Sequence, residues 1–279
     1  MSLAAVVKKE FDDSIRSNVL LGLTLLFLLF ATFLAAIQWL PVMYRDSTAT
    51  TSTLVLLNSM RQPTVMLVPL IGLGIGYGAI VRERETGSLK LMLGLPNTRR
   101  DVLLGKFVGR TAVVGIAILV GYSAAGIIAL VSYDAFDVVV FGLFTLLTLG
   151  YGGIYIAIGT CLSAVTKSRT VALSGAIFLY ALFMLGWDAF LLLLQLVTIG
   201  PTVPESGLPD WIQFVGILNP STSFMYATRA VIPQYYAITI FPESNAFYLQ
   251  DWVGFVVLAL WVVVTLGIGY VRFEKADIE

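Results

Sequence analysis

The sequence lacks histidine and contains a single cysteine, Cys161, among its 279 residues. One cysteine cannot form a disulfide within the chain, and the usual zinc and haem ligand sets need histidine or several cysteines. Nucleophilic catalysis by Ser-His-Asp or Cys-His arrangements is excluded because both need histidine. Charge is also scarce, since only 12% of the residues are charged, about half of what a soluble domain carries. We therefore expect no catalytic residues and no metal or cofactor bound by this chain.

Hydrophobic residues make up 58% of the chain and occur in long blocks, which indicates membrane spans rather than a globular core. A helix needs about 20 mostly apolar residues to cross a bilayer. Six segments meet this requirement, so we predict an all-α integral membrane protein with a single transmembrane domain over residues 1–279. The predicted spans are 18–40, 63–81, 107–131, 138–164, 170–188 and 251–271.

The basic residues are distributed unevenly between the two sides that six spans define. Of the 17 Lys and Arg residues, 14 lie on the side of the two termini and three, Arg45, Arg61 and Arg229, on the other side. Cytoplasmic loops carry the excess of basic residues, so we predict cytoplasmic termini in the plasma membrane. The 14 are Lys8, Lys9, Arg16, Arg82, Arg84, Lys90, Arg99, Arg100, Lys106, Arg110, Lys167, Arg169, Arg272 and Lys275.

Residues 1–17 are too polar to span a membrane but have an amphipathic pattern. Leu3, Val7, Phe11 and Ile15 recur every four residues, and the charged residues fall between them. This pattern is typical of a helix that lies on the membrane surface. An ordinary flanking segment is the alternative.

The segment 189–250 is predicted to be re-entrant and external. Residues 170–199 are too many for one crossing, and Trp187 and Asp188 fall about one bilayer thickness from Thr170. We therefore predict a separate short apolar helix over 189–199, in or along the outer leaflet, followed by short surface helices. A functional acid within the membrane remains the alternative for Asp188.

The stretch 80–110 holds seven of the 17 basic residues between two apolar runs. Ser88 is a candidate cap for a short helix that Pro96 ends, and Thr98 with Asp101 predicts a capping box for the next helix. The short helix would show Leu89, Leu91, Met92, Leu93 and Leu95 on the cytoplasmic side. Such a surface needs a membrane or a partner's groove to cover it.

The stretch "RERETGSLKLMLGLPNTRRDVLLGKFVGR", residues 82–110, resembles the cytoplasmic loop of ABC transporter permeases of the type 2 exporter class, and among them the NosY-like permeases. The order of interfacial helix, six spans and short external helices before the last span is similar as well. Outside the quoted stretch the resemblance is one of hydropathy pattern more than of residues.

This resemblance implies a non-catalytic subunit that couples ATP hydrolysis on a partner to export or to a mechanical signal across the membrane. The implied assembly contains two permease copies, as a homodimer, and two cytoplasmic ATPase subunits that bind ATP and Mg, with no nucleic acid. The loop 82–106 would carry the coupling helix that enters a cleft of the ATPase. The implied coupling residues are Glu83, Arg84, Glu85, Thr86, Gly87, Ser88, Leu89, Leu91, Met92 and Leu93.

The sequence itself contains no GxxxxGK[ST] motif, as expected if ATP binds a separate chain. An ion-gradient-driven secondary transporter is the alternative, but the span interiors hold few charges, whereas such transporters place charges or broken helices near the midplane. The glycine-rich stretch "GLGIGYG" places Gly72, Gly74, Gly76 and Gly78 at spacings that predict close helix packing. That packing could lie within one subunit, at the dimer contact or beside the pathway.

Overall fold

The computed structural model describes residues 3–16, 18–37, 51–94, 98–202, 207–239 and 246–276. Over these residues the chain is helical, and six helices are long and apolar enough to span a membrane. The predicted fold class is therefore confirmed. The spans are α2 (Val19–Ala36), α3 with α4 (Thr53–Glu85), α6 (Arg99–Ser132), α7 (Val138–Val165), α8 with α9 (Arg169–Thr198) and α12 (Val253–Glu274).

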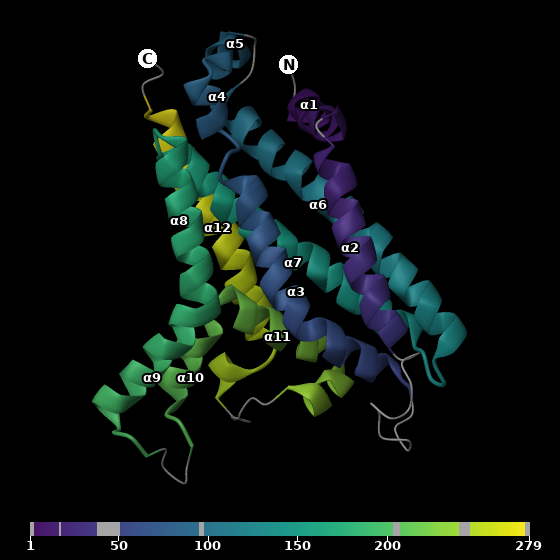
Figure 1. Cartoon of the computed structure of the whole chain (residues 1–279). Coiled ribbons are helices and arrows are strands. Elements are labelled where there is room, and N and C mark those ends of the chain that lie inside the picture. The colour runs from purple at the N-terminus through teal and green to yellow at the C-terminus, as the bar shows by residue number, and fades with distance from the viewer. Residues whose placement is uncertain are drawn as a thin grey trace.

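Figure 1 shows both termini at one end of the bundle, beside α1 (Leu3–Arg16), α4 (Val81–Glu85) and α5 (Ser88–Gly94). We call this the basic end. The opposite end holds α9 (Trp187–Thr198), α10 (Asp210–Ile217) and α11 (Pro220–Val231), together with the 3-10 helices η4 (Pro233–Ile238) and η5 (Phe247–Leu249). The predicted N-terminal and external helices thus form as helices, and their depth in a membrane stays a prediction.

The second span begins earlier than the sequence predicted. Helix α3 runs over Thr53–Gly76 and contains Pro63 and Pro69, whereas the predicted span began at residue 63. Proline removes one backbone hydrogen bond of a helix, and buried neighbours can replace the missing donor. Here the hydroxyl of Tyr151 donates to the carbonyl of Val65, the one that Pro69 leaves free, at 3.3 Å. The helix therefore continues through the proline.

The short apolar helix predicted over 189–199 is present as α9, but no loop separates it from α8, and its place relative to the membrane stays a prediction. Helix α8 (Arg169–Ala181) continues into α9 through the π-helical turn Leu182–Gly186. The continuous helical segment covers Arg169–Thr198. A π turn leaves a backbone group out of the regular ladder. The side-chain amide of Asn219, which precedes α11, donates to the carbonyl of Phe183 at 2.8 Å. The turn is thus stabilised by a contact from a segment that is distant in the sequence.

The packed interior of the described residues has a large core along the spans, a smaller core at the basic end, and a third cluster between α10, α11, η5 and α12. The large core includes fully buried aromatic residues such as Tyr122, Phe144 and Tyr155. The smaller core joins residues from the α3–α4 link, α5, α6, α7 and α12: Ala79, Ile80, Leu89, Met92, Val102, Leu103, Ala164 and Phe273. Helix α11 packs on α12 and α7 rather than lying loosely on a surface. Burial of its apolar face is what the short external helices need to be stable.

Candidate functional site

The chain changes direction between α3 and α4, at the start of the predicted coupling loop. The hydroxyl of Ser163, on α7, accepts hydrogen bonds from the backbone N–H groups of Ile80 and Val81 at 2.8 and 2.9 Å. These N–H groups belong to the first residues of α4, which have no partner within their own helix. Ser163 is fully buried, so α4 starts from a fixed point on α7.

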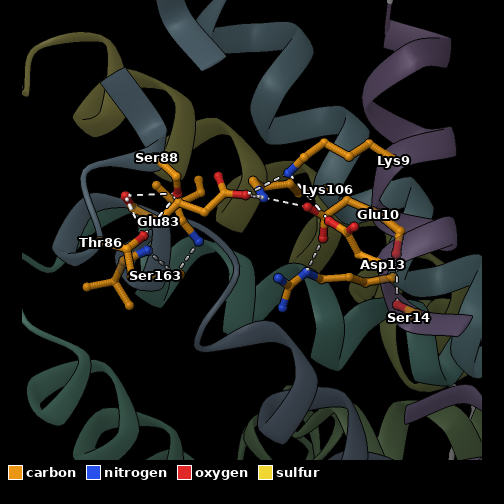
Figure 2. Close-up of polar contacts among 12 residues, drawn as sticks. Lys9, Glu10, Asp13, Ser14, Glu83, Thr86, Ser88, Lys106 and Ser163 are labelled. Carbon is orange, nitrogen blue, oxygen red and sulfur yellow. Dashed lines mark hydrogen bonds and ion pairs between the residues drawn. The ribbon is translucent and has the colours of Figure 1, made fainter. Parts of the chain in front are cut away.

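A fully buried lysine lies behind α4. Lys106 of α6 has no exposed surface and is within 2.5 Å of the Glu10 carboxylate on α1 and 2.8 Å of the Glu83 carboxylate on α4. Figure 2 shows Lys106 between these two carboxylates. Charges are taken out of water only at a large cost, which good pairing geometry offsets. Lys106 thus joins three helices through one ammonium group.

Glycines on α6 let α1 approach this lysine. A Cβ at Gly105 would lie 2.7 Å from the Val6 Cβ, and one at Gly109 would lie 2.8 Å from the Glu10 Cβ. Both distances are too short for real carbon atoms, so a larger residue at either position would push α1 away. The spacing of four residues places both glycines on one face of α6. Glu10 reaches Lys106 because this face is bare.

Two more basic residues complete the ionic junction. Arg110 donates from Nε to Glu10 at 3.0 Å and also contacts the Ile75 carbonyl on α3. Lys9 lies 3.2 Å from Glu83 and 3.5 Å from Asp13. We define the ionic junction as six charged residues: Lys9, Glu10, Asp13, Glu83, Lys106 and Arg110.

The ionic junction shifts the pKa values of two of its members on α1, Glu10 and Lys9. Burial raises the pKa of the Glu10 carboxyl, but Lys106 and Arg110 outweigh burial, so the pKa of Glu10 is lowered overall. Burial opposes the charge on Lys9, but Glu83 and the neighbouring carboxylates outweigh it, so the pKa of Lys9 is raised. Both shifts favour the charged forms of Glu10 and Lys9.

The next two residues of the predicted coupling loop contact the turn between α7 and α8. Arg84 donates to the Thr166 carbonyl at 2.7 Å, and the carboxylate of Glu85 accepts from the backbone N–H of Arg169 at 2.7 Å. A carboxylate at a helix N-terminus stabilises the helix through its unpaired N–H groups. The stretch 83–85 is therefore linked to α1, α6, α7 and α8.

Thr86, Gly87 and Ser88 form the elbow between α4 and α5. Gly87 has a φ of 74°, which glycine adopts without strain. The hydroxyls of Thr86 and Ser88 are 3.0 Å apart, and Ser88 also donates to the Glu83 carbonyl at 3.4 Å. Ser88 is the first residue of α5, where the sequence predicted its cap. The conformation of the elbow is therefore stabilised by the hydroxyls of Thr86 and Ser88.

The prediction that α5 shows its apolar residues outward is wrong for the two that the structure describes. Leu89 is fully buried and Met92 is 8% exposed, both in the small core at the basic end. The side chains of Leu91 and Leu93 lie outside the described residues, as does Leu95. The apolar pattern of a helix does not show whether its apolar face is covered by a partner protein or by other segments of the same chain. Lys90 is exposed on α5.

Helix α6 begins where the sequence predicted a start. The Thr98 hydroxyl accepts from the Asp101 backbone N–H at 3.1 Å, and the Asp101 carboxylate accepts from the Thr98 N–H at 3.1 Å. The predicted capping box is thus confirmed. The neighbouring Arg99 donates to the carbonyls of Phe273, Glu274 and Ala276 at the end of α12. The start of α6 thereby covers unpaired carbonyls of another helix.

The four glycines of "GLGIGYG" separate into two pairs. A Cβ at Gly72 would lie 2.7 Å from the Tyr155 Cβ, and one at Gly76 would lie 2.8 Å from the Gly159 Cα, both on α7. Gly74 and Gly78 have open space where a Cβ would be. The first pair therefore packs within the subunit, whereas Gly74 of α3 and Gly78 of the α3–α4 link present bare backbone.

Sequence reasoning named Glu83 but missed its partner Lys106 and the second carboxylate that Lys106 pairs with, Glu10. The residues 105–110, "GKFVGR", carry the signal that could have found them. Two glycines four residues apart mark a close helix contact, and a basic residue follows each. A charge beside such a contact requires a counter-charge on the approaching helix. Nothing in the sequence, however, states which helix approaches.

Taken together, the six apolar helices define a multi-pass, all-helical membrane protein with an ionic junction at its basic end. The chain belongs to the ABC-2 family of transporter proteins, because the model of that family matches residues 4–278. It is therefore a permease subunit of an ABC transporter, as the resemblance predicted.

Two relatives agree with this assignment. The chain is 31% identical over 220 residues to the "Probable ABC transporter permease protein NosY" of Stutzerimonas stutzeri, and the match covers 77% of each chain. It is 27% identical over 277 residues to the protein of the same description from Pseudomonas aeruginosa, with 98% of each chain covered. The second match extends over the elbow and the ionic junction alike.

Proposed function

We propose that this permease couples ATP hydrolysis on a separate cytoplasmic ATPase to export of a substrate, or to a mechanical signal, across the plasma membrane. Two copies of this chain act with two ATPase subunits, and both termini are cytoplasmic. ATP and Mg belong to the ATPase. Helix α5 is the coupling helix that the ATPase contacts.

The observation that carries this proposal is the set of links from the α4–α5 elbow to the spans. Glu83 pairs with Lys106 on α6 and Lys9 on α1, Arg84 reaches the Thr166 carbonyl, and Leu89 is buried in the core at the basic end. A force on α5 is therefore delivered to several spans together. A loop that served only to set topology would need none of these contacts.

The same contacts indicate which helices a displacement of α5 would move. Displacement of α5 acts on α6 and α12 through the small core, which includes Leu103 and Phe273. It acts on α1 through the Glu83–Lys106–Glu10 chain. Packed elements shift between discrete arrangements rather than deforming continuously, so the spans tilt as a group.

The test is co-purification of tagged permease with candidate ATPase subunits. The variant Lys90→Glu/Leu91→Glu changes α5, and Lys275→Glu, exposed at the same end, is the matched control. We expect the α5 variant to lose the ATPase and the control to retain it. An ATPase that stays bound to both variants contradicts the role of α5.

A second variant separates contact from coupling. Glu83→Gln leaves α5 unchanged but removes a charge next to Lys106, so we expect the ATPase to co-purify while its stimulation in the assembled transporter falls by about tenfold or more. If no ATPase subunit binds the unaltered chain, the coupling proposal fails, and a transporter driven by an ion gradient becomes the function to test.

A further inference from the structure

A cavity of about 580 Å³ lies at the basic end, between α1, α3, α6 and the start of α8. Its size falls in the range of about 300–1,000 Å³ that is usual for small-molecule sites. Four guanidinium groups and two carboxylates line it, so the lining has two more positive than negative charges. The charged lining residues are Arg16, Arg82, Arg110, Arg169, Glu10 and Asp13.

The negative charges in this lining already have partners. Glu10 contacts Lys106 and Arg110, at 2.5 and 3.0 Å, and Asp13 lies 3.5 Å from Lys9. By contrast, Arg16 and Arg82 are exposed, and neither forms an ion pair with any residue in the described part of the chain. Two guanidinium groups at the cavity are thus available to an external anion.

The remaining walls are apolar or bare backbone. Val19, where α2 begins, and Ile75 contribute aliphatic surface, while Gly74 and Gly78 have open space where a Cβ would be. The guanidinium of Arg169 is held at the rim by the Tyr77 hydroxyl, 3.4 Å away. The cavity is therefore amphipathic, and it lies at the level where the apolar spans end.

We propose that this cavity binds the phosphate group of an anionic ester, supplied by a membrane lipid headgroup or by a soluble phosphate ester. Guanidinium groups bind phosphate oxygens through paired, charge-assisted hydrogen bonds. Basic pockets between membrane helices are suited to anionic headgroups. Arg82 directly precedes Glu83, so the bound anion lies beside the ionic junction. This site does not depend on the proposed coupling function.

The test uses the purified full-length permease, delipidated in an uncharged detergent. Binding of phosphatidylglycerol, phosphatidylcholine and glycerol 3-phosphate is measured by native mass spectrometry and by the shift in thermal unfolding. The variant Arg16→Gln/Arg82→Gln removes the two free guanidinium groups. Arg272→Gln, exposed at the same end but outside the cavity, is the matched control.

We expect phosphatidylglycerol to bind the unaltered chain and the control equally, and to bind the double variant about tenfold or more weaker. Binding of the lipid but not of glycerol 3-phosphate assigns the site to a headgroup, and equal binding of both assigns it to a soluble ester. If phosphatidylcholine binds as well as phosphatidylglycerol, or if the double variant binds like the control, the proposal is overturned.

Folding of the variants is checked by size-exclusion chromatography. Arg16 and Arg82 are exposed, so we expect the double variant to elute as the unaltered chain does. The single variants, Arg16→Gln and Arg82→Gln, provide a second measurement, with an expected loss of about threefold each, half of the double variant's free energy. Single variants that bind like the control overturn the proposal as well.

Discussion

The two ends of the bundle are held together by different chemistry. At the basic end, a fully buried Lys106 pairs with carboxylates from two other helices. At the opposite end, buried hydroxyls and aromatic rings connect α3, α7 and α11, and the ring centroids of Tyr151 and Phe224 are 4.4 Å apart. An ionic contact acts over a longer range than a hydroxyl contact and changes with protonation. The opposite end also holds an ion pair, Arg229–Asp251 at 3.2 Å, but among the described residues the basic end has the larger ionic cluster and so the stronger dependence on charge.

The hydroxyl network is complete by itself. Tyr155 donates to Ser221 at 3.0 Å, Ser221 to Tyr151 at 2.7 Å, and Tyr151 to the Val65 carbonyl at 3.3 Å, in the donor order that satisfies every hydroxyl. The ionic junction is not complete in the same way, because Glu83 Oε2 is buried without a hydrogen-bond partner among the described residues. A complete network favours one arrangement. An incomplete one leaves room for a second arrangement during coupling.

Replacement of Lys106 should break the basic end with the largest effect. Lys106→Met leaves Glu10 and Glu83 without their shared partner, so we expect a loss of about 3–5 kcal/mol in the free energy of unfolding. Lys9→Met, whose side chain is 46% exposed, is the control, with an expected loss of about 0–1 kcal/mol. Unfolding of the purified protein in detergent measures both. Equal losses for the two lysines would refute the buried-charge argument.

Replacement of Ser221 should break the opposite end with a smaller effect. Ser221→Ala removes the acceptor of Tyr155 and the donor to Tyr151, and we expect a loss of about 1–3 kcal/mol. Thr198→Ala is the control, because that exposed hydroxyl bonds only its own helix, at the Leu194 carbonyl. The same unfolding measurement applies. A Ser221 variant as stable as the control would show that the hydroxyl network contributes little.

Acidification should distinguish the two ends, with the smallest effect of the three. The pKa of Glu10 is lowered by Lys106 and Arg110 from the ordinary value of 4.5. Its contribution to stability is therefore complete above pH 4.5 and is lost as the pH falls through the lower pKa of the folded state. The pH dependence of thermal unfolding measures this loss. We expect Glu10→Gln to reduce the dependence and Ser221→Ala to leave it unchanged; the opposite result would place the acid-sensitive contacts elsewhere.

Much of the fold could be predicted because it depends on local pattern. Apolar length identified all six spans, and the capping box at Thr98 and Asp101 was correct to the residue. The errors were boundaries and burial. Helix α3 continues through Pro69 because Tyr151 supplies the missing donor, and Leu89 is buried because other segments of this chain cover it. Each error depends on a contact between segments far apart in the sequence.

In the candidate site, too, the residues of the loop could be predicted from the sequence, whereas their long-range contacts could not. Residues Glu83 to Ser88 were predicted by resemblance as coupling residues, and their coupling role stays a prediction. The pairing of Glu83 and of Glu10 with Lys106 was not predicted, because an ion pair over 96 residues, such as Glu10–Lys106, has no fixed spacing in the sequence. Only the packing of α1 onto the bare glycine face of α6 brings those charges together.

The sequence by itself determined the helical membrane class, the number of spans, the concentration of charge at the basic end and the membership in the ABC-2 family. These properties follow from composition, periodicity and similarity, which need no knowledge of neighbours. The tertiary structure decided which charges pair, which apolar face of α5 is buried and where the basic cavity lies. The reason is physical: burial and pairing energies depend on the distance between groups, and helix packing alone sets that distance.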